Sequence, residues 1–94
     1  MNSENLTIND RKYCFEYQEQ AARTIITINA EQWTEQDTGN IKKLGQLLGQ
    51  RLRVHIDPNL PQRLFVQKIE PKENPVSVPI DELKTIVKNC LDTM

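Results

Sequence analysis

Cysteine and histidine are scarce in this chain of 94 residues, and their scarcity disfavours several kinds of site. The two cysteines, Cys14 and Cys90, have neither a CxxC spacing nor the spacing of a disulfide framework. The single histidine, His55, has only Asp57 beside it on the same predicted strand face, whereas a metal site needs three or four ligands. We therefore expect no metal and no cofactor, and two free thiols of the kind found in cytoplasmic proteins.

Catalytic chemistry also lacks its usual residues. A nucleophilic thiol would need Cys14 or Cys90 beside His55 in an electropositive setting. Cys90 falls on the apolar stripe of a predicted helix, and only Lys12 is charged positively near Cys14. The few glycines lie in a helical segment and form no phosphate-binding loop. We predict no catalytic residue, and a small cysteine-dependent enzyme is the least favoured reading.

Long hydrophobic runs are absent, and hydrophobic residues make up 37% of the chain. No run approaches the length of a membrane span, and the start of the sequence has no basic segment followed by an apolar one. We expect a cytoplasmic protein without a membrane partner. The length favours a single domain over residues 1–94, and residues 1–9 are expected to be loose because they lack a strong pattern.

Charge is plentiful, and it is distributed unevenly. The formal net charge is −1, but residues 1–37 sum to −4, residues 38–69 to +5 and residues 70–94 to −2. Asp57 is the single acidic residue of the middle block. An anionic partner would find its best footprint there.

The first half of the chain predicts a hairpin followed by a helix. Residues 11–18 alternate between apolar and polar, as a half-buried strand does, and residues 23–29 are rich in β-branched side chains. One helical face follows, and its start is expected between Ala30 and Asp37, where Thr34 and Asp37 resemble a capping box. Four residues form that face: Ile41, Leu44, Leu47 and Leu48.

The second half predicts the same order again. Residues 51–57 alternate, a proline-containing turn follows, and residues 63–70 form the partner strand. The side of this partner strand that faces the core is left open, since Leu64 and Val66 compete with Phe65 and Ile69. The final helix has a clear apolar stripe from Ile80 to Leu91.

Together these elements predict an α+β fold of order ββαββα. It is a two-layer sandwich, with a four-stranded, mainly antiparallel sheet and two helices on one face. The repeated order also indicates a weak internal duplication with an offset of about forty residues, with Arg23 and Arg63 each opening the second strand of a hairpin.

The basic middle block supplies the candidate binding residues. In a pair of antiparallel strands, alternate residues share one surface, which predicts a basic and partly aromatic patch. The candidates are Arg51, Arg53, His55, Arg63 and Phe65, together with Lys42 and Lys43.

The sequence thus favours a small non-enzymatic binding or regulatory module that acts through its open sheet face and basic strand surface. A protein partner or a second copy, giving a homodimer, is the first expectation, with Ile25, Tyr13 or Tyr17 as contacts. The alternative is an RNA or single-stranded DNA binding protein, for which charge and an aromatic platform are the needed features.

Overall fold

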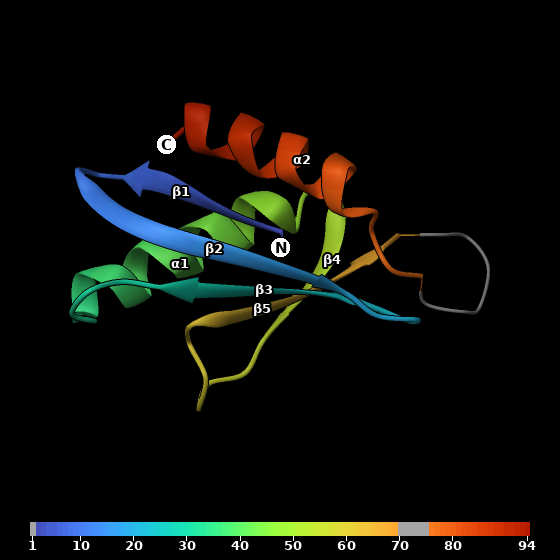
Figure 1. Cartoon of the computed structure of the whole chain (residues 1–94), viewed down its shortest axis with the longest axis horizontal. Helices are drawn as coiled ribbons and strands as arrows, with labels where there is room; N and C mark the ends of the chain where they lie inside the picture. The colour runs from blue at the N-terminus through green and yellow to red at the C-terminus, as the bar shows by residue number, and fades with distance from the viewer. Residues whose placement is uncertain (1, 70–75) are drawn as a thin grey trace.

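Alternating apolar and polar residues give this chain an antiparallel sheet, and two apolar stripes of helical period give it two helices (Figure 1). The computed structural model describes residues 2–69 and 76–94. Its elements are β1 (Ser3–Ile8), β2 (Arg11–Glu19), β3 (Thr24–Asn29), α1 (Glu35–Leu48), β4 (Leu52–Ile56), β5 (Arg63–Lys68) and α2 (Ile80–Asp92). The strands pair in the order β1-β2-β3-β5-β4. The predicted α+β class is confirmed. Neither helix of the described residues is long and apolar enough to cross a membrane.

The predicted four-stranded ββαββα order is wrong, because a further strand, β1, precedes the first predicted hairpin. The expectation of a loose segment at residues 1–9 is therefore wrong for Ser3–Ile8, which pairs with β2. Asn9 and Asp10 join the two strands with φ angles of 50° and 65°. A two-residue hairpin turn needs such positive φ angles, and Asn and Asp adopt them more readily than most residues.

Both helices pack on the same face of the sheet. On that face, β2 contributes Phe15, which is fully buried, and β5 contributes Leu64 and Val66. Residue 45 of α1 approaches this face so closely that a Cβ atom there would lie 2.9 Å from Ile56 Cδ1, which is why Gly45 permits the packing. The side of β5 that the sequence left open is thereby settled. Leu64 and Val66 face the helices, and Phe65 faces the opposite way.

Apart from the edge strand β1, the sheet consists of the β2–β3 and β4–β5 hairpins, whose second strands pair with each other. Strands β2 and β3 precede α1, strands β4 and β5 precede α2, and β3 pairs antiparallel with β5. Ile25 pairs with Phe65, so the residues at the middle of this pairing are forty positions apart in the sequence. The internal duplication stays a prediction, since β1 has no counterpart in the second half of the described chain.

A buried carboxylate joins the β1–β2 hairpin to the start of α1. Asp37 has no exposed side-chain surface, and its Oδ2 accepts hydrogen bonds from Arg11 Nη2 at 2.7 Å and from the Thr34 backbone N–H at 2.8 Å. The Tyr13 hydroxyl donates to Asp37 Oδ1, and Asn40 Nδ2 donates to the Tyr13 oxygen at 2.9 Å. The helix therefore begins at Glu35, inside the predicted interval, with the predicted Thr34 cap.

The same contacts fix the charge state of the carboxylate. The hydrogen bonds from Arg11 hold the pKa of Asp37 well below its usual range, against the opposing effect of burial, and those from Tyr13 and Thr34 act in the same direction. A group whose pKa is lowered by folding stabilises the folded state above its unfolded pKa, and it loses that contribution as the pH falls through the folded value.

Replacing Asp37 tests this network. We expect Asp37→Asn to lower the free energy of unfolding by about 1–3 kcal/mol at neutral pH, because the amide turns one acceptor oxygen into a donor facing donors. In urea unfolding, the deficit relative to the natural chain should be constant above about pH 5 and shrink as the pH falls to about 3. In that range Asp37 of the natural chain takes up a proton in the unfolded state, while in the folded state it stays charged. Glu35→Gln, in the same helical turn but exposed, is the matched control. An equal loss in both variants would contradict the assignment.

Leu83→Ala tests the docking of α2. Leu83 is fully buried among the core side chains, so its truncation should destabilise the protein by about 2–5 kcal/mol in urea unfolding. Leu60→Ala removes the same atoms from an exposed position and should change stability little. Near-equal values for the two variants would mean that α2 is not packed on the sheet in solution.

Candidate nucleic-acid interface

Four of the predicted binding residues lie together on the open face, the sheet face opposite the helices. Alternation along β4 and β5 turns Arg53 and His55 away from the core, and it does the same for Arg63 and Phe65. His55 lies directly opposite Phe65 in the antiparallel pairing of β4 with β5. The predicted juxtaposition of these two strands is thus present in the structure.

Phe65 is at the centre of this group. Its ring is partly exposed, and the His55 ring lies against it with a centroid separation of 6.1 Å. The guanidinium of Arg23 lies over the Phe65 ring, 4.5 Å from its centroid. Such a contact is a cation–π interaction, and it orders a side chain that would otherwise move freely in solvent. The basic sheet face is defined here by five residues: Arg23, Arg53, His55, Arg63 and Phe65.

Arg23 was not among the predicted site residues. It precedes β3, whereas Phe65 lies in β5, so only the pairing of β3 with β5 brings them together. One signal was present, since Arg23 and Arg63 stand forty residues apart, as do Ile25 and Phe65. The antiparallel register then places Arg23 and Arg63 two residues to either side of the Ile25–Phe65 pair.

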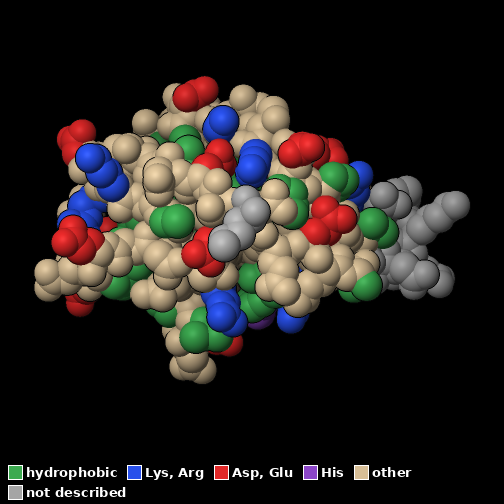
Figure 2. All heavy atoms as spheres, viewed as in Figure 1, with side chains coloured by type: hydrophobic (Ala, Val, Ile, Leu, Met, Phe, Trp, Pro, Cys, Tyr) green, Lys and Arg blue, Asp and Glu red, His purple; other side chains and the backbone are tan. Residues whose placement is uncertain are grey.

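The charge of the basic sheet face is not neutralised by its described neighbours. Among residues 2–69 and 76–94, Arg23, Arg53 and Arg63 form no salt bridge. The nearest acidic residues are Asp57, which follows β4 two residues after His55, and Glu16, which Thr27 separates from Arg63. Figure 2 shows acidic and basic side chains interspersed over the upper part of the molecule, where α2 lies. The basic sheet face differs in gathering three arginines, with the acidic residues Asp57 and Glu16 at its margin on the Arg63 side.

Three predicted residues lie elsewhere. Lys42 and Lys43 are exposed on α1, in the helical layer on the other side of the sheet. Arg51 belongs to the turn after α1, where it lines a small hollow with Asn89 and Cys90 of α2. Alternation places Arg51 in line with Arg53, but β4 begins only at Leu52, after Arg51.

The prediction that Tyr13 and Tyr17 are exposed for contact with a partner is wrong. Tyr13 and Tyr17 face the helices, and both are buried. Ile25 does lie on the open face, but only 8% of its surface is exposed. The open face therefore offers polar and cationic groups around one aromatic ring.

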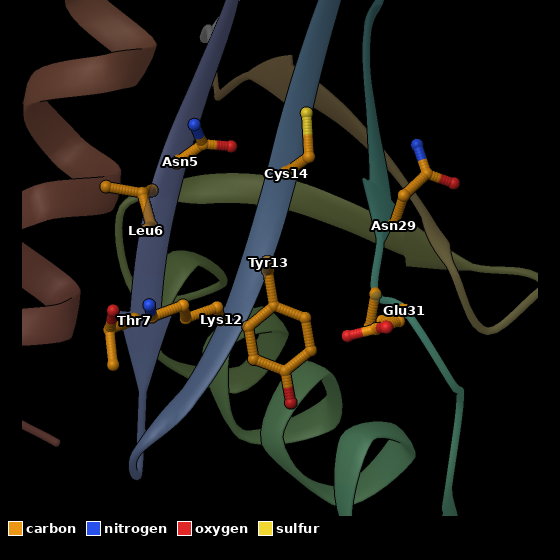
Figure 3. A pocket seen from close by; sticks show the side chains of 9 residues that line it. Asn5, Leu6, Thr7, Lys12, Tyr13, Cys14, Asn29 and Glu31 are labelled. Atoms are coloured by element: carbon orange, nitrogen blue, oxygen red, sulfur yellow. The ribbon is translucent and has the colours of Figure 1, made fainter.

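Another hollow lies on the open face itself, at the end formed by β1, β2 and β3. Asn5, Cys14 and Asn29 form a row across β1, β2 and β3 there, in a depression of about 540 Å³ that Lys12 and Glu31 also line (Figure 3). Cys14 lies three strands from His55 in the sheet order, a separation of about 14 Å or more. The structure thus keeps thiol and imidazole apart. No group of three metal-ligating side chains occurs within the described ranges.

The two thiols should differ in reactivity. Cys14 is partly exposed, whereas Cys90 is buried on α2, and burial raises the pKa of the Cys90 thiol. In the folded protein, a disulfide reagent such as DTNB should label Cys14 much faster than Cys90. Cys14→Ser should remove the fast phase and Cys90→Ser the slow one. Equal rates in the natural chain would show that α2 opens readily.

Comparisons with known proteins do not add to this geometry. No family model, curated protein or solved structure matches the chain. The residues of the basic sheet face are therefore the features from which a function can be inferred.

Proposed function

We propose that the protein is a non-enzymatic binding module that holds an anionic partner on its basic sheet face. One observation carries the proposal. Arginines from three separate parts of the chain, Arg23, Arg53 and Arg63, meet around a partly exposed aromatic ring, and none has an acidic partner among the described residues. Unpaired cations gathered on one face attract a polyanion, and they do so most strongly at low salt.

The way these side chains are held favours recognition. Arg53, His55, Arg63 and Phe65 lie in hydrogen-bonded strands, so their Cα positions are fixed before a partner arrives. The Arg23 guanidinium is ordered by the Phe65 ring and by donation from its Nε to Gln20 Oε1 at 3.2 Å. Preorganised groups lose less entropy on binding than mobile ones do. The side chains gathered here can bind a partner through charge and through stacking, which supports binding as the function.

Self-association stays a prediction. The contacts expected for a homodimer, Tyr13 and Tyr17, are buried in the core. An anionic partner would use the groups that are exposed on the open face. For this reason we favour an anionic partner over a second copy of the chain.

Retention on heparin–agarose tests the proposed function. The natural chain should be retained at low salt and released by a NaCl gradient, although its net charge is −1. Arg53→Gln combined with Arg63→Gln should elute at clearly lower salt. Lys42→Gln combined with Lys43→Gln removes the same charge from the helical layer and should elute close to the natural chain.

Two results would oppose the proposal. If the natural chain passes through the column at low salt, the basic sheet face does not bind polyanions. If the two double variants elute at equally lowered salt, retention depends on the total charge of the protein and not on the basic sheet face.

A further inference from the structure

We infer that the anionic partner is single-stranded nucleic acid, whose bases stack on Phe65, Arg23 and His55 while its phosphates contact Arg53 and Arg63. The inference rests on the proposed function and names the partner class for the same surface. The evidence for it is the arrangement of planar side chains at the centre of the basic sheet face. Binding of an anion by charge alone would not need such planar groups.

Three planar groups meet at this position. The Arg23 guanidinium lies 4.5 Å from the Phe65 ring centroid, and the His55 ring centroid lies 6.1 Å from it. Aromatic rings and guanidinium planes are the surfaces on which unpaired bases stack. Arg23 and His55 are exposed and Phe65 is partly so, which leaves ring and guanidinium surface available to an arriving base.

Cations lie on both sides of the planar groups. Arg63 comes two residues before Phe65 on β5, and Arg53 lies on β4 opposite Gln67, two residues after Phe65. A nucleic-acid backbone crossing the face would therefore meet a guanidinium on each side of its stacked bases. Arginine suits this role because its forked donors match phosphate oxygens.

Polar side chains complete the surroundings of the stacking groups. Gln18 lies in the same cross-strand row as Ile25, Phe65 and His55, and its side chain is exposed. Gln67 donates from Nε2 to the Ala22 carbonyl at 3.0 Å, which ties β5 to the segment before Arg23. The face thus offers a hydrogen-bonding group two strands from the Phe65 ring and a fixed support for the arginine above the ring.

The geometry selects single strands over duplexes. A base can lie on the Phe65 ring or on the Arg23 guanidinium only if its own face is free, and in a duplex that face is covered by the next base pair. An acidic peptide would satisfy the arginines but would leave the planar groups without a matching partner. Single-stranded nucleic acid uses both kinds of group.

An abasic oligonucleotide separates stacking from charge. Fluorescence anisotropy at about 50 mM NaCl would compare labelled oligothymidylate of about 12 nucleotides with an abasic strand of the same length and charge. The strand with bases should bind about 5- to 150-fold more tightly, the range that stacking of one base supplies. A duplex of the same length and a glutamate peptide should bind more weakly than the single strand.

Two variants locate the effect. Phe65→Leu should lower the affinity for oligothymidylate by at least about 5-fold and lower the affinity for the abasic strand much less. Arg23→Gln removes a second stacking group at an exposed position, where folding should be preserved. It should reduce the difference in affinity between the base-bearing and the abasic oligonucleotide. The Lys42→Gln, Lys43→Gln double variant should keep the full difference in affinity between the two oligonucleotides. Thermal unfolding of each variant checks that its fold is intact.

The outcomes distinguish this inference from the proposed function. Equal affinity for the abasic and the base-bearing strands, with heparin retention intact, would overturn the nucleic-acid assignment and leave anion binding standing. Equal or tighter binding of the duplex or of the glutamate peptide would overturn it too. Loss of all polyanion binding would instead remove the proposed function itself.

Discussion

The buried Asp37 carboxylate is the interaction on which much of this fold depends. It accepts from Arg11 and Tyr13 of β2 and from Thr34 at the start of α1, so one side chain fixes a strand and a helix together. The hairpin turn joins the same network, because Asn9 Nδ2 donates to Asn40 Oδ1 at 2.9 Å. A buried charge is tolerated only when its partners are all in place, which makes the relative position of these elements specific.

The division between the two sheet faces follows from that arrangement. With the helices on one side, every second strand residue enters the core, and the residues between them are left to solvent or to a partner. Leu64 and Val66 are fully buried, while Phe65 between them is turned outward. The rigidity of the candidate site is thus supplied by core residues that no partner touches.

Local patterns predicted most of the strands and both helices, because alternation and helical spacing are visible over short windows. They missed β1, where the apolar pattern is confined to Leu6 and Ile8 and where the turn depends on backbone angles at Asn9 and Asp10. The site was predicted where it follows alternation, at β4 and β5. Arg23 was not predicted as a site residue, because its position over Phe65 depends on which strands are neighbours in the sheet. The direction in which Phe65 faces could not be predicted either, because apolar residues occupy both sides of β5.

The central pairing of β3 with β5 has a consequence for the direction of a bound strand. Arg23 and Arg63 stand at equal spacings on opposite sides of the Ile25–Phe65 pair, so these two charges look alike to a chain crossing in either sense. The equivalence is broken by the aromatic ring, which occurs on β5 and has an aliphatic side chain as its counterpart on β3. Charge breaks it too, since Arg53 lies on the Arg23 side of the central pair and Glu16 lies on the Arg63 side. For the single-stranded partner proposed above, the 5′-to-3′ polarity would therefore be set by Phe65 and its neighbour His55 together with this uneven charge.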